Sequence, residues 1–229
     1  MSDFIASFQQ NFIDESRYLY LLQGLGTTLL ITAFAAIIGI ILGFLVAVIR
    51  STYDQTGKMK FLNAICNIYL TVIRGTPTMV QLLIMYYVIF ASSNLNKVVV
   101  AFLAFGINSG AYVAETIRSG IMAVDSGQME AGRALGFSKL RTMQYIILPQ
   151  AFKNILPAIG NEMIALLKET SVAGYVAVVD ITKAAVQIKN TTYDHINPII
   201  LIALVYLVIV MVLTKLLGIF ERRLRKSER

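Results

Sequence analysis

The 229-residue sequence has no tryptophan, one cysteine and one histidine, and only 14% of its residues are charged. Cys66 lies in an apolar stretch and has no second cysteine to pair with, so neither a disulfide framework nor redox chemistry is expected. His195 has no second metal-ligand candidate near it in the sequence, so we predict no metal site. Without tryptophan, tyrosine and phenylalanine must supply the aromatic residues of any membrane interface.

The sequence also lacks the motifs of common nucleotide-binding and catalytic sites. It contains no GxxxxGK[ST], and therefore no P-loop for nucleotide phosphates, and no HExxH, GxSxG or CxxC. Its acidic residues are dispersed, and no two are spaced for acid–base work. We therefore expect a protein that is not an enzyme and that binds no cofactor itself.

What the sequence does contain is apolar residues, at 57% of the chain with a mean hydropathy of +0.70. This composition is typical of an integral membrane protein, and residues 1–229 read as a single transmembrane domain. The net charge of +7 could suggest nucleic-acid binding, but the basic residues gather at the ends of apolar segments. That distribution is the one expected beside a membrane.

Five apolar segments predict an all-α fold with five membrane spans, at about residues 20–49, 61–91, 97–119, 150–168 and 196–216. Gly39 and Gly43 in the first segment form a GxxxG pair, which permits close helix contact. No basic leader with a cleavage site precedes it, so no signal peptide is predicted. Phe4, Ile5, Phe8 and Phe12 share a helical face that either lies on the outer membrane surface or belongs to a frayed tail.

Basic residues predict the orientation of these spans. The loops at 50–60 and 118–153 are rich in lysine and arginine, as is the tail Glu221–Arg229, which has five basic residues against two glutamates. Such segments stay in the cytoplasm and suit anionic lipid headgroups. We therefore predict a multi-pass protein of the cytoplasmic membrane, with the N-terminus outside and the C-terminus inside.

The second segment predicts a broken helix. As one helix, the 36 residues Phe61–Asn96 would measure ~54 Å, too long for one span. Arg74-Gly75-Thr76-Pro77 offers the break, because Pro77 removes a backbone donor and disfavours helix at Thr76. Broken backbone at membrane depth needs protein or a watery cavity around it, so Arg74 either faces a polar interior or extends to the inner interface.

The loop 125–149 is too charged to lie in lipid and too regular to be a simple connector. Asp125 can cap a helix, and Gln128, three residues later, is placed to donate back to it in a capping box. Gly136 is placed to end the helix. A membrane protein that displays a short helix of small residues in water is expected to present it to a soluble partner.

The residues of this loop resemble a known family motif. Glu130-Ala131-Gly132, followed by Gly136, Ile146 and Leu148-Pro149, is similar to the EAA loop of the membrane subunits of bacterial ABC importers. Gly132 departs from the pattern, since the family usually has alanine there, and a glycine could loosen the helix slightly. Arg74-Gly75-Thr76-Pro77 with Gln81, the stretch Ala111–Gly120 and the LLKETSV stretch resemble the polar amino-acid branch of these permeases.

The resemblance implies a five-helix type I importer permease with a cytoplasmic coupling helix that docks on a separate ATPase, where ATP and Mg would bind. It further implies an external amino-acid-binding protein and a second, identical permease copy, so that the permease is expected to act as a homodimer. The residues expected to contact the ATPase are Met129, Glu130, Ala131, Gly132, Arg133, Leu135 and Gly136.

Polar residues inside the apolar segments are the candidates for substrate contact: Glu162, Asn161, Arg74, Asn108, Ser109, Gln81 and Lys168. Glu162 lies ~18 Å along its segment from Gln150, at mid-depth, where a carboxylate is costly unless it serves a function or a pair. It either contacts substrate or forms a buried pair with Arg74 or Lys168. Glu115 and Arg118, three residues apart, are expected to form a structural ion pair.

Two further expectations complete the sequence analysis. Val172–Val179, which Asp180 and Lys183 end, is too short to span and predicts a short helix dipping from the outer face, capped by Thr170 or Ser171. The favoured function is uptake of a polar, preferably basic, L-amino acid. The alternative is a gradient-driven transporter or channel, which explains Arg74 and Glu162 but not the helix in the loop.

Overall fold

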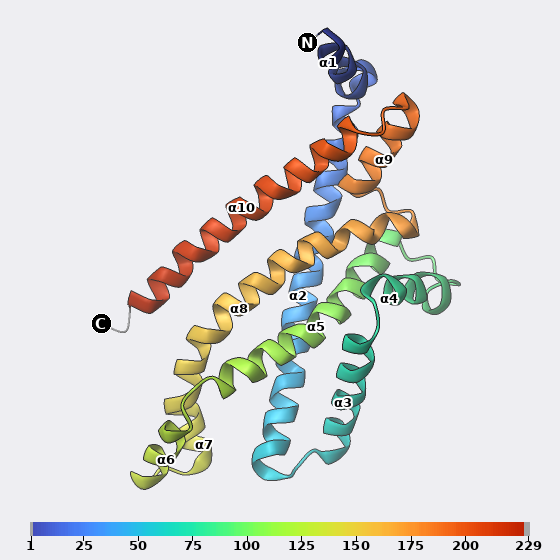
Figure 1. The fold of residues 1–229 in the computed structure, drawn as a ribbon. Helices are drawn as coiled ribbons and strands as arrows, with labels where there is room; N and C mark the ends of the chain where they lie inside the picture. The colour runs from blue at the N-terminus through green and yellow to red at the C-terminus, as the bar shows by residue number, and fades with distance from the viewer. Residues whose placement is uncertain (1, 227–229) are drawn as a thin grey trace.

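The computed structural model describes residues 2–226, and every regular element in that range is a helix (Figure 1). The α-helices are α1 (Ser2–Phe8), α2 (Tyr18–Thr56), α3 (Lys60–Gly75), α4 (Thr78–Ile84), α5 (Lys97–Met122), α6 (Ser126–Ala134), α7 (Lys139–Thr142), α8 (Leu148–Glu169), α9 (Ile181–Thr192) and α10 (Asn197–Lys226). Short π-helical turns lie at Gln9–Ile13, Met85–Ile89 and Met143–Ile147, and short 3-10 turns at Asp14–Ser16 and Thr170–Val176.

Three of the described helices, α2, α5 and α10, are long and apolar enough to cross a membrane, and α3 with the following segment to Ile89 forms a bent fourth candidate. Helix α8 is as long as a span but carries Lys153 and Glu162. The predicted count of five spans therefore remains a prediction. The α2–α3 turn lies at the same end of the bundle as α6 and α7, while the N-terminal segment and α9 lie at the opposite end (Figure 1).

Glycines allow α2 and α5 to pack closely along their middle. A Cβ on Gly39 would lie 2.5 Å from Ser109 Oγ, and one on Gly43 would lie 2.6 Å from Val113 Cγ1. Gly106 on α5 makes the reciprocal approach to α2. The GxxxG pair thus serves a helix contact within this chain, which fixes α5 and the polar residues on it.

The predicted break in the second apolar segment is confirmed. Helix α3 ends at Gly75, Thr76 is extended with φ −125° and ψ 148°, and Pro77 has φ −64° and ψ 136°. The two halves meet at 111°, so α4 leaves the direction of α3 sharply (Figure 1). The cause is the proline, which cannot supply the backbone donor that a continuing helix needs.

The short helix predicted over Val172–Val179 is confirmed only in part, because a 3-10 helix covers Thr170–Val176, and the predicted cap is wrong. Thr170–Val176 continues from α8 as a 3-10 turn, and Thr170 Oγ1 donates back to the carbonyl of Leu167 at 2.8 Å instead of capping a new helix. The new helix is α9, and Asp180 caps it by accepting from the backbone N–H of Lys183 at 2.9 Å. The sequence predicts Asp180 only as the end of an apolar stretch, whereas its carboxylate begins the helix that follows.

A side-chain hydrogen bond joins the N-terminal segment to the loop before α10. Asn11 is buried, and its Nδ2 donates to Asp194 Oδ2 at 2.7 Å. Asp194 also accepts from the backbone N–H groups of Ile196 and Asn197 and from Asn197 Nδ2. These donors, with the N–H of Ile196 first, lower the pKa of Asp194 to about 2.

The remaining predictions concern the two ends of the chain, which the structure describes only in part. Phe12 is buried, while Ile5 and Phe8 are exposed, so part of the predicted apolar face is free. The side chain of Phe4 and the last three residues of the predicted basic tail lie outside what the structure describes.

Candidate functional site

The loop after α5 contains a helix with a defined start. Asp125 Oδ1 accepts from the backbone N–H of Gly127 at 2.7 Å, so the predicted N-cap of α6 is confirmed. The capping box with Gln128 does not form. Gln128 Oε1 instead accepts from Gln150 Nε2 at 3.4 Å, which links the start of α6 to the start of α8.

The end of α6 is equally defined. Gly136 has φ +86°, its N–H donates to the carbonyl of Arg133 at 3.0 Å, and the N–H of Phe137 donates to the carbonyl of Gly132 at 3.1 Å. This pair of bonds is a Schellman motif, which requires a left-handed residue that glycine adopts most readily. Gly136 therefore ends the helix, as predicted.

Gly132, where the family usually has alanine, is a packing contact. A Cβ at this position would lie 2.4 Å from Thr142 Cγ2 and 3.0 Å from Ile146 Cδ1. Gly132 and Thr142 are both buried in an otherwise exposed loop. The glycine thus permits α6 to lie directly on the returning segment, and the expected loosening of the helix is offset by this contact.

The outer surface of the loop combines charge with exposed apolar side chains. Glu130 and Arg133 are exposed, and Leu135 is 76% exposed, Leu140 59% and Tyr145 71%. The loop that carries these residues, with α6 and α7, lies at one end of the bundle (Figure 1). Of the other predicted contact residues, Ala131 is exposed and Met129 is half-buried.

Side chains satisfy the backbone carbonyls that the break after α3 leaves without helical partners. Gln81 Nε2 donates to the carbonyl of Ile73 at 2.7 Å and to the carbonyl and hydroxyl of Thr76 at 3.0 and 2.8 Å. Asn108 Nδ2 on α5 then donates to Gln81 Oε1 at 2.9 Å. Gln81 and Asn108, both predicted to contact substrate, are therefore engaged in holding the break against α5.

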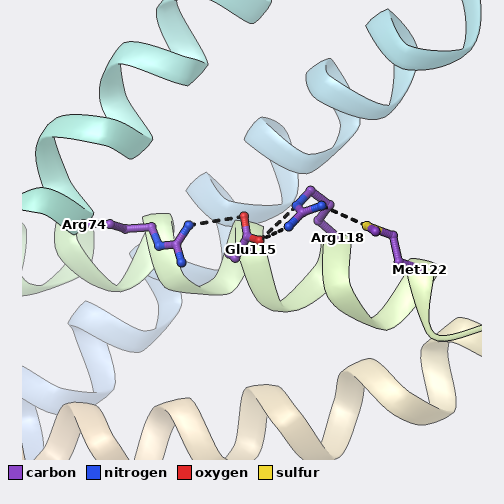
Figure 2. Close-up of polar contacts among 4 residues, drawn as sticks. All are labelled: Arg74, Glu115, Arg118 and Met122. Atoms are coloured by element: carbon purple, nitrogen blue, oxygen red, sulfur yellow. Dashed lines mark hydrogen bonds and ion pairs between the residues drawn. The ribbon is translucent and has the colours of Figure 1, made fainter.

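Charged residues beside the break form one cluster (Figure 2). Glu115 on α5 accepts from Arg118, with Nε–Oε1 at 2.9 Å, and pairs with Arg74 of α3 at 3.4 Å. Arg118 also contacts Met122 Sδ, and the Arg74 guanidinium lies 6.0 Å from the ring centre of Tyr112. One carboxylate thus serves two guanidinium groups, and it joins α3 to α5.

A cavity of about 160 Å³ lies between α5 and α8. It is lined by Asn108, Ser109, Tyr112, Glu162, Ala165, Leu166 and Glu169. Sequence reasoning identified three of the polar ones and missed Tyr112 and Glu169. The signal for Glu169 was available, because residues seven apart lie on the same face of a helix and Glu162 is seven residues earlier.

The structure does not bring the other predicted residues into this cavity. Asn161 is exposed and donates to the carbonyl of Pro157 at 3.1 Å, and Lys168 is exposed. The alternative pairing of Glu162 with Arg74 or Lys168 is wrong, since among residues 2–226 Glu162 makes no ion pair and Arg74 pairs with Glu115. Glu162 therefore lines the cavity with a carboxylate that no ion pair engages among the described residues.

Comparison with solved structures defines the class of this fold. The chain resembles one from the crystal structure of an amino acid ABC transporter with histidines, with 41% identity, a TM-score of 0.84, and coverage of 93% of this chain and 98% of the other. A chain of the inward-facing methionine ABC transporter MetNI has a TM-score of 0.72 at 17% identity and supports the fold alone. The chain has the all-α fold of type I ABC importer permeases.

Comparison of sequences then gives the family. Residues 39–226 match the model of the binding-protein-dependent transport system inner membrane component, and the chain belongs to that family. It is 39% identical over 212 residues to the arginine transport system permease protein ArtQ of Bacillus subtilis (strain 168), covering 91% of this chain and 94% of that protein. It is 34% identical over 215 residues to the L-cystine transport system permease protein TcyB of the same organism, covering 93% and 89%. The chain is therefore a membrane permease of the amino-acid ABC transport type.

Proposed function

We propose that this chain imports a polar, preferably basic, L-amino acid and is driven by a separate ATPase that binds helix α6. The observation that carries the proposal is the exposed loop with its capped and packed helix α6. Asp125 and Gly136 fix the two ends of α6, Gly132 packs it onto the returning segment, and Leu135 and Tyr145 are left in water. Exposed apolar side chains among charges are typical of a surface that a partner covers.

In this proposal α6 transmits movement. Closure of two ATPases on ATP would displace two such helices, and the attached spans would change between outward-open and inward-open states. Glu130 and Arg133 supply charged contacts, and Met129 and Leu135 supply apolar ones. ATP and Mg bind on the partner, an external binding protein delivers the substrate, and the permease acts as a pair with the N-terminus of each copy outside and its C-terminus in the cytoplasm.

The cavity between α5 and α8 supports the choice of substrate. Glu162 and Glu169 both line it, with Asn108, Ser109 and Tyr112 around them. Two carboxylates of α8 that line one cavity favour a cationic side chain or an amino group over a carboxylate. One relative named above is an arginine permease and the other an L-cystine permease, so their names alone do not favour a basic substrate. The preference for a basic amino acid therefore rests on these two carboxylates.

The coupling is tested by purifying the tagged permease with its partners. Glu130→Lys and Gly136→Asp are expected to lose the ATPase subunit and uptake together, because the first reverses a contact charge and the second strains the Schellman motif. Lys189→Glu, on α9 at the opposite end, is the control and should keep both. A gradient-driven transporter would show uptake with no ATPase bound, and undiminished uptake by the two variants would contradict the proposal.

The substrate is tested by uptake of radiolabelled arginine and glutamine into proteoliposomes of the complete transporter. Glu162→Gln is expected to reduce arginine uptake more than glutamine uptake, while Asn161→Ala, next to it but outside the cavity, should change neither. Unchanged arginine kinetics in Glu162→Gln would remove this carboxylate from the site.

A further inference from the structure

A second cavity lies at the end of the bundle that carries α6. It has a volume of about 260 Å³ and is formed by α2, α5 and the returning part of the loop. Its lining residues are Ala47, Arg50, Ser51, Asp54, Gln55, Ala114, Arg118, Ile121, Met122, Lys139 and Met143. None of them is a candidate substrate contact, and only Arg118 and its contact Met122 also belong to the cluster described above.

The charges in this cavity do not balance. Arg50, Arg118 and Lys139 line it with only one carboxylate, that of Asp54. An adjacent cavity shares Arg50 and Arg118 and adds Arg74 and Glu115, so four cations face two carboxylates across both. Among residues 2–226, the side chains of Arg50 and Lys139 form neither a hydrogen bond nor an ion pair, which leaves their donors open to an anion.

The walls between these charges are apolar. Ala47, Ala114, Ile121 and Met143 line the same cavity, so an anion that enters it also brings a carbon skeleton into contact with hydrocarbon side chains. A free inorganic anion would gain nothing from those walls, whereas a phosphodiester with attached acyl chains would satisfy both kinds of surface.

The position of the cavity agrees with this chemistry. Arg50 follows directly on the long uncharged stretch of α2, and Arg118 lies near the end of α5. On the orientation of the proposed function, on which this step rests, both side chains lie at the level of the cytoplasmic lipid headgroups. Basic pockets between helices at that level suit anionic headgroups.

From these observations we infer that this cavity binds an anionic phospholipid, whose phosphate lies among Arg50, Arg118 and Lys139. Because Lys139 and Met143 belong to the loop and Arg50 and Arg118 to the bundle, the lipid joins the loop that carries α6 to α2 and α5. A lipid in this position makes the support of α6 depend on the headgroup composition of the inner leaflet.

The test counts bound lipid directly. The full chain is reconstituted in nanodiscs of phosphatidylcholine with a minor fraction of phosphatidylglycerol, released into detergent, and analysed by native mass spectrometry. We expect retained phosphatidylglycerol, and about five-fold weaker retention in Arg50→Gln and in Lys139→Gln for the one charge that each removes. Lys58→Gln, which removes a basic charge from the same end but outside the cavity, is the control and should retain phosphatidylglycerol like the unaltered chain.

Two further arms keep the outcomes distinct. Arg50→Lys keeps the charge but loses the planar fork, and should retain lipid at a level between Arg50→Gln and the unaltered chain. Addition of inorganic phosphate should not displace phosphatidylglycerol; displacement would identify a free-anion site and overturn the lipid assignment. Equal loss in Lys58→Gln and Lys139→Gln would show a general surface-charge effect and would also overturn it. Lipid counts do not depend on uptake, so failure of the transport proposal would be seen separately.

Discussion

Asn108 Nδ2 on α5 donates to the side-chain oxygen Oε1 of Gln81 at 2.9 Å, and Gln81 Nε2 in turn donates to the backbone carbonyl of Ile73 at 2.7 Å. The backbone carbonyl that the Pro77 break leaves without its helical partner is therefore satisfied through a side chain that α5 holds in place. Inside a membrane no water is available to donate a hydrogen bond to such a carbonyl. The side-chain amides of Gln81 and Asn108 therefore determine whether the broken segment is stable.

Gln81→Leu is therefore expected to destabilise the protein by about 1–3 kcal/mol, since it leaves the carbonyl of Ile73 and the amide of Asn108 without partners. Thermal unfolding of the purified protein in detergent measures this as a lower Tm. Gln23→Leu, at an exposed position on α2, is the matched control and should leave Tm unchanged. Equal Tm values for the two variants would contradict the assigned role of Gln81.

Replacement of Glu115 is expected to lower the stability of the protein more than replacement of either of its arginines. Glu115→Gln leaves both Arg74 and Arg118 without a carboxylate, whereas Arg74→Gln leaves the Glu115–Arg118 pair intact. Because the arginine side chains are 42% exposed, the loss is expected to be about 1 kcal/mol, and lower for Arg74→Gln. The order of the Tm values in low salt tests this, and a larger loss in Arg74→Gln would refute it.

Gly132 and Thr142 offer a test by compensation. Gly132→Ala should weaken retention of the ATPase, because the new Cβ lies 2.4 Å from Thr142 Cγ2 and displaces α6 from the returning segment. Thr142→Ser removes that methyl group and keeps the hydroxyl bonded to the carbonyl of Ser138. Partial recovery in the double variant, measured by ATPase co-purification, is the expected result. Additive losses would mean that this contact does not position α6.

The bond between Asn11 and Asp194 predicts a specific dependence on pH. Hydrogen bonds lower the pKa of Asp194 to about 2, from an ordinary value near 3.8, so the carboxylate contributes stability above pH 3.8 and loses it as pH falls through about 2. The difference in Tm between the unaltered chain and Asp194→Ala should therefore be constant from pH 7 to pH 5. It should shrink only below pH 4, and a difference that disappears between pH 7 and pH 5 would show that this residue has no lowered pKa.

Several of these features could be read from the sequence because they depend on local chemistry. Pro77 predicted the break, Asp125 and Gly136 predicted the ends of α6, and the three-residue spacing predicted the contact of Glu115 with Arg118. Each needs only the preferences of a residue and its near neighbours.

What could not be predicted depends on which helices meet. The close approach of Gly132 to Thr142 depends on how α6 packs on the returning segment of its own loop. The second partner of Glu115 comes from α3, which is distant in sequence. Glu162 was assigned Arg74 as one possible partner because both are charged at membrane depth, but the fold gives Arg74 to Glu115. The sequence places Asp180 after a short apolar stretch and so predicts it as the end of a helix, although an aspartate is equally suited to begin the next one.

The most direct test of the account is the accessibility of position 133 in α6. Arg133→Cys in a Cys66→Ser background gives a chain with one cysteine, which is probed in intact cells with a membrane-impermeant maleimide and in inside-out vesicles with a cross-linker. The account predicts no labelling of intact cells and a cross-link to the ATPase subunit in the vesicles. Labelling of intact cells, or vesicles in which position 133 cross-links to no ATPase, would contradict the placement of α6 and the coupling that depends on it.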